Sequence, residues 1–111
     1  MSKTVQRISA EKLLPVLEQY KKENCVVIDA RDSSKFTQGH IPGAVNVDPS
    51  IMNSHLKLLN YLNKTAIFIY CGYGIRTQSV IEKLKDARYK GDLYSISDGF
   101  EGWQDLGYEV E

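Results

Sequence analysis

The sequence predicts an α/β fold in which a mainly parallel sheet of about five strands is flanked by helices on both faces. Two short runs, 26–30 and 66–70, are rich in β-branched and aromatic residues and almost continuously apolar. Strands covered on both faces have this composition, which places both runs at the centre of the sheet. Segments with helical spacing of apolar residues lie between the strands, and such alternation favours a parallel sheet.

Three weaker strands complete the predicted sheet. They cover residues 4–8, 44–47 and 93–96, and the last of them follows a turn signal at residues 90–92. The chain therefore supplies enough strands for a sheet with helices packed against each face.

Ser9 is the predicted N-cap of the first helix, which Pro15 is expected to shorten or kink. The second helix is predicted after Pro49 and Ser50, and a third runs from the region of Thr77 to about Tyr89. Short helical turns are predicted at 33–38 and 100–106. The expected apolar faces are Leu13, Leu14, Leu17 and Tyr20 in the first helix, Ile51, Met52, Leu56, Leu59 and Leu62 in the second, and Val80, Ile81, Leu84 and Ala87 in the third.

The most informative segment follows the strand at 66–70. Cys71 comes directly after this strand, at the turn into the third helix. Ligands of open α/β sheets bind beyond the carboxyl ends of strands, where a helix N-terminus offers unpaired N–H groups and partial positive charge. Such an environment favours the thiolate form of a cysteine. The position therefore predicts that Cys71 is a nucleophile, whereas a buried, inert cysteine is the alternative.

The predicted substrate-binding loop comprises Gly72, Tyr73, Gly74, Ile75 and Arg76. We expect its two glycines to let the backbone curl so that N–H groups face the sulfur. Arg76 would add positive charge beside a bound anion, although a solvated helix-start arginine is the alternative. A sulfur carried on Cys71 as a persulfide would then pass to an acceptor by double displacement.

A nucleotide site is a weaker interpretation of the same loop. Gly72 and Gly74 fit the beginning of a dinucleotide-binding fingerprint, and Asp98 lies beyond the next strand as a candidate ribose ligand. However, Thr77 replaces the third glycine of that fingerprint, and the lysine of a Walker A motif is missing from the loop. The match is therefore weak.

Three motifs in order make the chain resemble the rhodanese homology domain over nearly its whole length. They are Asp29-Ala30-Arg31 with Phe36 and Gly39-His40-Ile41-Pro42-Gly43-Ala44, then the Cys71 loop, then Gly99-Phe100-Glu101-Gly102-Trp103. The resemblance implies a three-layer sandwich with a five-stranded parallel sheet. It also implies a sulfurtransferase in which Cys71 accepts sulfur from a donor such as thiosulfate and yields it to cyanide, a thiol or a protein thiol.

The length of the loop separates two chemistries within that fold. Cys71 and Arg76 are separated by four residues, one fewer than in related cell-cycle phosphatases, and the shorter loop favours sulfur over phosphate. An atypical cysteine phosphatase and a catalytically silent binding module remain alternatives. Tyr73 and Ile75 make the loop bulkier than in thiosulfate-using relatives, so Tyr73 could select an organic or protein-bound persulfide, while Asp98 replaces a glycine common in the family.

Several conspicuous residues are predicted to be structural. We expect His40 to bond to the backbone and fix a loop, with general-base catalysis as the alternative. Asp29 and Arg31 would share one face of a strand and form an ion-pair network, and Cys25 is expected to be an inert thiol. Three aromatic residues are expected to cap the core near the C-terminus: Phe100, Trp103 and Tyr108.

Charge and length narrow the class of protein. Fourteen Lys and Arg residues balance 14 Asp and Glu residues, so no global field favours nucleic acid or an anionic membrane. A length of 111 residues predicts one domain over 1–111. The N-terminus lacks a signal-peptide pattern and no apolar run approaches the roughly 20 residues that span a bilayer. We therefore expect a cytoplasmic monomer without cofactor or metal, whose partners are a small sulfur donor and a thiophilic acceptor, with a sulfur-accepting protein as a further candidate.

Overall fold

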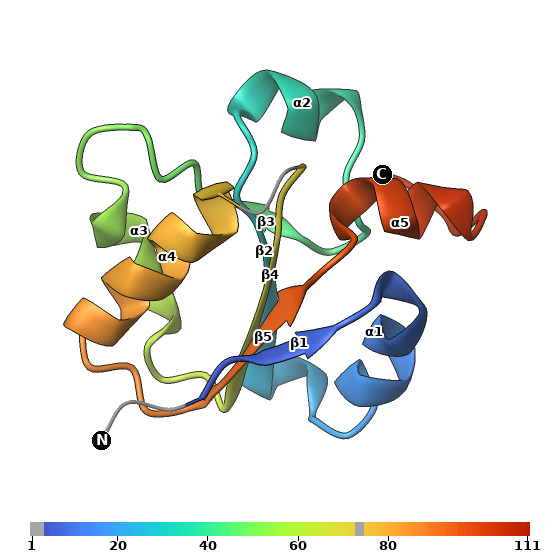
Figure 1. The fold of residues 1–111 in the computed structure, drawn as a ribbon. Helices are drawn as coiled ribbons and strands as arrows, with labels where there is room; N and C mark the ends of the chain where they lie inside the picture. The colour runs from blue at the N-terminus through green and yellow to red at the C-terminus, as the bar shows by residue number, and fades with distance from the viewer. Residues whose placement is uncertain (1–3, 73–74) are drawn as a thin grey trace.

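The computed structural model describes residues 4–72 and 75–111, and within them it contains a parallel sheet of five strands (Figure 1). The strand order is β1-β5-β4-β2-β3, and every neighbouring pair runs parallel. The bounds are Gln6–Ile8 for β1, Cys25–Asp29 for β2, Val45–Asn46 for β3, Ala66–Tyr70 for β4 and Asp92–Ile96 for β5. The sequence-based prediction of the sheet is therefore confirmed.

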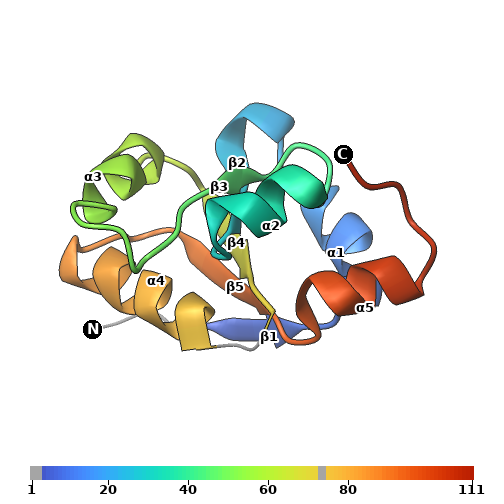
Figure 2. The same cartoon turned by 90° about the horizontal axis from the view of Figure 1, so that it is seen from above.

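Helices cover both faces of the sheet and form a three-layer sandwich. α1 and α5 lie on one face, α3 and α4 lie on the other, and α2 sits above the edge at which the strands end (Figures 1 and 2). Their bounds are Ala10–Leu17 for α1, Ser33–Gln38 for α2, His55–Leu58 for α3, Ile75–Asp86 for α4 and Gly99–Asp105 for α5, with 3-10 turns η1 at Lys22–Asn24 and η2 at Leu59–Tyr61. No helix in the described part of the chain is long and apolar enough to cross a bilayer.

The central strand β4 divides its side chains between the two faces. Phe68 and Tyr70 belong to the cluster beneath α1 and α5, whereas Ile67 and Ile69 belong to the cluster beneath α3 and α4. All four are fully buried, because side chains alternate between the faces of a strand and both faces here are covered. This anchoring fixes the end of β4, and therefore the start of the segment that begins with Cys71.

Helix α1 differs from its prediction in two respects. Leu13 is buried, but Leu14 is 43% exposed, so it does not belong to the buried face. Ser9 occupies the predicted N-cap position, but its side chain makes no capping hydrogen bond. Instead, the Asp98 carboxylate accepts a hydrogen bond from the Ala10 N–H group at 2.7 Å. A residue far away in the sequence therefore satisfies one of the free donors at the start of α1.

The prediction of one amphipathic helix after Pro49 and Ser50 is wrong, because this segment forms a turn followed by the short elements α3 and η2. Ser50 donates from its backbone N–H to the Asp48 carboxylate at 2.9 Å, and Asn53 adopts the left-handed region at φ 64°. These features hold a turn where the helix was expected, because Asx turns and left-handed residues interrupt helical geometry. Consequently α3 and η2 bury Leu58, while four of the residues expected in the core are exposed: Ile51, Met52, Leu56 and Leu59.

The helix after the Cys71 loop is close to its prediction. α4 buries Val80, Ile81 and Leu84 but ends at Asp86, before the half-buried Ala87. Arg88 then takes φ 62°, a left-handed conformation that ends a helix.

Candidate functional site

Cys71 lies at the carboxyl edge of the sheet, directly after β4. It is 4% exposed and packs in the cluster beneath α3 and α4. The neighbouring strands end nearby, since Asp29 of β2 is in register with Tyr70 and Ser95 of β5 with Ile69. The structure thus places the cysteine where ligands bind in open parallel sheets.

Thr77 contacts the sulfur of Cys71. Its hydroxyl donates to Sγ at 3.0 Å from the first turn of α4, and Thr77 is itself buried. A hydroxyl donor stabilises a charged sulfur more than a neutral one, because hydrogen bonds to charged groups are stronger. Sequence reasoning used Thr77 only as the residue that breaks a glycine pattern; the signal that was available is a hydroxyl in the first turn of the helix that follows the cysteine.

Gly99 supports the loop from behind. It has φ +58°, and a Cβ built at this position would collide with the carbonyl oxygen of Cys71. Glycine is therefore required both by its backbone conformation and by this close approach. The contact explains why the third sequence motif begins with glycine: the start of α5 packs directly on the backbone of Cys71.

Arg76 shares a pocket with Cys71 but is not an isolated positive charge. Its Nη1 donates to Asp48 Oδ1 at 2.9 Å, and the Arg76 side chain is 40% exposed. Burial alone would raise the pKa of Asp48, but hydrogen bonds from Ser50 and the neighbouring Arg76 guanidinium bring it below its usual value. Asp48 remains ionised beside the arginine and offsets part of its charge, and no sequence motif pointed to this distant partner.

The rest of the predicted loop is only partly described. Gly72 is exposed, its φ lies outside the left-handed region, and no described atom lies within 4 Å of the place a Cβ would take. Gly72 therefore does not use the left-handed conformation that glycine allows. Ile75 begins α4 and is 80% exposed, while Tyr73 and Gly74 lie outside the described residues.

A pocket of about 210 Å³ connects this loop to α2. Its lining residues from the loop and α4 are Cys71, Gly72, Ile75 and Arg76, and those from α2 and the connection that follows β2 are Arg31, Asp32 and Lys35. The structure thus brings Cys71, Gly72, Ile75 and Arg76 together around one opening.

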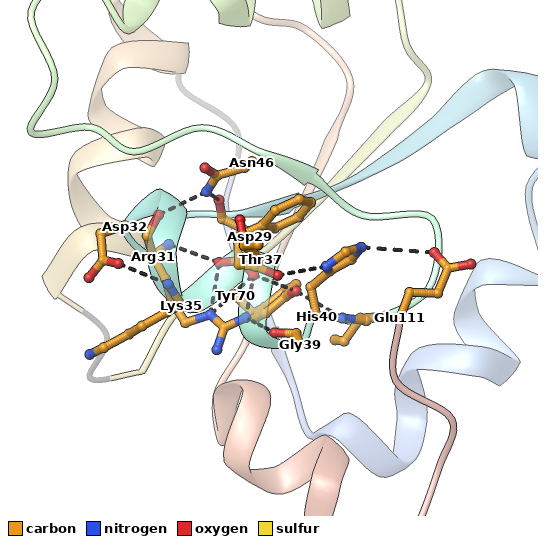
Figure 3. Close-up of polar contacts among 12 residues, drawn as sticks. Asp29, Arg31, Asp32, Lys35, Thr37, Gly39, His40, Asn46, Tyr70 and Glu111 are labelled. Carbon is orange, nitrogen blue, oxygen red and sulfur yellow. Dashed lines mark hydrogen bonds and ion pairs between the residues drawn. The ribbon is translucent and has the colours of Figure 1, made fainter.

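Asp29 and Arg31 form a polar network at the carboxyl ends of β2 and β4 (Figure 3). Arg31 binds the Asp29 carboxylate through Nε at 3.0 Å and through Nη2 at 2.7 Å, and Nη2 also donates to the Gly39 carbonyl at 2.6 Å. The Tyr70 hydroxyl donates to the same carboxylate at 2.7 Å, and burial raises the pKa of Tyr70. These buried groups are occupied with each other, so the network holds the loops, as the sequence predicted.

The family of the chain follows from comparison with known proteins. The family model described as "Rhodanese-like domain" matches residues 14–106, a span that includes all three sequence motifs. The chain belongs to the rhodanese-like domain family. Among curated relatives of the chain, thiosulfate sulfurtransferase GlpE of Coxiella burnetii is 33% identical over 95 residues, covering 82% of each chain. GlpE of Pseudomonas putida is 34% identical over 88 residues, covering 79% of this chain and 77% of the relative.

Solved structures agree on the rhodanese fold. The Alr3790 protein from Anabaena superposes with a TM-score of 0.77 at 24% identity, covering 94% of this chain and 90% of that chain. A thiosulfate sulfurtransferase from Pseudomonas aeruginosa also gives 0.77, at 19% identity, and covers 96% of this chain but 20% of that longer chain. Identities of this size show the shared fold alone.

Other conspicuous residues in and near the rhodanese motifs contact the backbone or the core. The His40 ring stacks on Phe36 with centroids 3.8 Å apart, and its Nδ1 lies 2.8 Å from the Phe36 carbonyl oxygen. The residue therefore fixes the loop after α2, as expected. Phe100 and Trp103 are buried, whereas Tyr108 is 37% exposed and lies against the Trp103 ring.

Asp98, which replaces a glycine common in the family, has a defined structural role. Its bond to Ala10 caps α1, and a Cβ at Gly102 would collide with its carboxylate. The nucleotide interpretation thus loses its candidate ribose ligand, which the start of α1 already occupies. Among the described residues, no group of three or more His, Cys, Asp and Glu side chains could hold a metal ion.

Proposed function

We propose that this protein is a sulfurtransferase that carries sulfane sulfur on Cys71 as a persulfide. The donor is thiosulfate or a related sulfane compound, and the acceptor is a thiophile such as cyanide or a thiol. The observation that carries the proposal is the placement of the Cys71 Sγ: it follows the central strand, faces the first turn of α4 and accepts a hydrogen bond from Thr77 at 3.0 Å. The family and its relatives named thiosulfate sulfurtransferase support the same chemistry.

The first half-reaction loads the cysteine. The Cys71 thiolate attacks the outer sulfur of thiosulfate, the S–S bond of thiosulfate breaks, and sulfite leaves with the electron pair. The product is Cys71–S–S⁻. In this step the Thr77 hydroxyl and the N-terminus of α4 stabilise negative charge at the sulfur.

The second half-reaction transfers the outer sulfur from Cys71 to the acceptor. An acceptor such as cyanide attacks the terminal sulfur, the S–S bond of the persulfide breaks, and Cys71 leaves as thiolate. Thiocyanate is the product, no electrons are gained or lost overall, and no oxidant or reductant is needed. Because the first product leaves before the second substrate reacts, the scheme is a double displacement.

Arg76 has a secondary part in this proposal. It lines the pocket beside Cys71, but its bond to the ionised Asp48 reduces the charge it presents. We infer that Arg76 helps to place the loop through Asp48 and attracts the anionic donor only weakly.

The test is initial-rate kinetics of thiocyanate formation with thiosulfate and cyanide both varied. The proposal predicts parallel double-reciprocal lines for the wild type, loss of activity in Cys71→Ser and retained activity in the matched control Cys25→Ser. Hydrolysis of an aryl phosphate without thiocyanate formation would instead support the phosphatase, and neither activity would leave a binding module. Activity that survives Cys71→Ser would overturn the assignment of the nucleophile.

A further inference from the structure

A second pocket opens on Cys71 from the side of the sheet that carries α4. It has a volume of about 580 Å³ and is bounded by α4 on one wall and by β1 with the end of β5 on the other. Cys71, Gly72 and Thr77 lie at its head, and Ser95 and Ser97 lie on the β5 side. We call this pocket the α4–β1 groove. The pocket that contains Arg76 meets it at Cys71 and Gly72.

Arg7 lies on the β1 wall of the groove. In the parallel register it is the partner of Ser95, and Val5, two residues earlier, packs in the cluster beneath α3 and α4. Because alternate residues of a strand share a face, Arg7 points to the same side of the sheet as α4. β1 is separated from β4 by β5 alone, so Arg7 starts about 10 Å across the sheet from the end of β4, within reach of a ligand bound at Cys71.

Lys85 lies on the helical wall. Thr77, Ile81 and Lys85 all line the groove, and their spacing places them along one side of α4. Lys85 is therefore about 12 Å along the helix axis from Thr77, the residue that contacts the Cys71 sulfur. Two cations, one on each wall, thus lie beyond the reactive sulfur.

The Lys and Arg side chains that line the groove have no acidic counterpart among the described lining residues. Both Arg7 and Lys85 are exposed, neither makes an ion pair within residues 4–72 and 75–111, and no Asp or Glu is among the described residues that line the groove. A further opening at Gly72 has the opposite charge. Its described lining includes no Lys or Arg but contains four acidic residues: Glu11, Asp98, Glu101 and Asp105. In a chain of zero net charge, this asymmetry directs an anion toward the α4–β1 groove and away from the acidic opening.

We propose that the α4–β1 groove binds the negatively charged end of a thiol acceptor, with Arg7 and Lys85 as the cations that hold it. The inference rests on the proposed persulfide at Cys71. The acceptor thiolate attacks the terminal sulfur of Cys71–S–S⁻, the persulfide S–S bond breaks, and the products are an acceptor persulfide and the Cys71 thiolate. Carboxylates on the carbon skeleton of the acceptor thiol extend into the groove beyond the position that the compact cyanide ion occupies.

A charge series of small thiols tests this assignment. Cys71 is first loaded with thiosulfate, and intact mass confirms one added sulfur. Loaded protein is then discharged by 2-mercaptoethanol, which is neutral apart from its thiol, or by mercaptosuccinate, which carries two carboxylates. The rates are compared for the wild type, the double variant Arg7→Gln with Lys85→Gln, and the matched control Lys12→Gln with Lys90→Gln, which removes two exposed positive charges outside the groove.

The groove variant is expected to lose about tenfold in the mercaptosuccinate rate and less than about twofold in the 2-mercaptoethanol rate, the size expected for two exposed charge contacts. The control is expected to change neither, and the wild-type preference should shrink at high salt. Equal losses with both thiols, or no loss with either, would overturn the inference. Failure of Cys71 to load would instead overturn the proposed function, so the two failures are distinguishable.

Discussion

The two cysteines lie at opposite ends of the same sheet. Cys71 follows β4, whereas Cys25 begins β2, whose first residue is in register with the first residue of β4. At the Cys71 end, the Thr77 hydroxyl in the first turn of α4 donates to the sulfur at 3.0 Å. At the Cys25 end, the thiol donates to the Lys22 carbonyl oxygen at 3.8 Å. The sulfur thus accepts a hydrogen bond at one end of the sheet and donates one at the other.

This difference follows from the direction of the strands. In a parallel sheet every strand delivers its carboxyl end to one edge, and the helices that follow begin there with free N–H groups. Strand beginnings meet the C-terminal ends of helices and turns, where free carbonyl groups gather. Independently of these carbonyl groups, burial raises the pKa of Cys25 above its ordinary value, with Lys64 opposing the effect and Glu23 adding to it. Position in the sheet decides which thiol is suited to carry negative charge.

The largest effect at the Cys71 end is expected from Gly99→Ala. The new methyl group meets the Cys71 carbonyl oxygen and φ stays in the left-handed region, so we expect a loss of about 3 kcal/mol in the free energy of unfolding. The control is Gly107→Ala, just beyond the other end of α5, where φ is +76° but the space is open, and about 1 kcal/mol is expected. Chemical denaturation measures both, and equal losses would show that the contact with Cys71 is not tight.

Cys25 should behave as an ordinary or weakened thiol in alkylation. Because its pKa is raised from 9.0, the protonated form dominates at neutral pH, and the rate with iodoacetamide should increase about tenfold per pH unit between pH 7 and 9. The measurement uses Cys71→Ser so that one thiol remains. A rate that levels off below pH 8 would contradict the comparison between the two ends of the sheet.

Thr77→Val tests the donor at the Cys71 end. The change keeps the shape and removes the hydroxyl that donates to Sγ, so we expect sulfur loading from thiosulfate to slow about tenfold, the effect of one hydrogen bond to a charged group. Thr77→Ser should restore the rate. The matched control is Thr37→Val, which removes an exposed hydroxyl bonded to the Ser33 carbonyl oxygen and should leave loading unchanged.

The smallest effect is expected from Gly72→Ala. The position is exposed and has no described atom near a new Cβ, so sulfur transfer should change less than about twofold and stability by less than about 0.5 kcal/mol. A large loss would show that the loop needs glycine at this position, contrary to the conformation described above.

Much of the fold could be predicted from the sequence because it depends on local pattern. The run at 66–70 predicted β4 without error, since a short, continuous apolar segment is typical of a strand covered on both faces. The segment after Pro49 could not be predicted in this way, because its turn depends on the hydrogen bonds of Asp48 and on the backbone of Asn53. The spacing of apolar residues alone does not reveal where such a turn interrupts a helix.

In the candidate site, too, local features could be predicted from the sequence and contacts between distant segments could not. Cys71 was identified by its position between a strand and a helix, which is a local feature of the sequence. Asp48 as the partner of Arg76, and Gly99 against the Cys71 carbonyl, are contacts between segments far apart in the chain. Likewise, the roles of Arg7 and Lys85 depend on β1 lying at the far side of β5, which no single motif contains.

The central claim is that Cys71, and not Cys25, carries the transferred sulfur. It is tested most directly by intact-mass measurement after incubation with thiosulfate, for the wild type, Cys25→Ser and Cys71→Ser. The account predicts that the wild type and Cys25→Ser each gain one sulfur atom that cyanide removes, and that Cys71→Ser gains none. The account is contradicted if Cys71→Ser gains a sulfur atom from thiosulfate, or if Cys25→Ser fails to gain one.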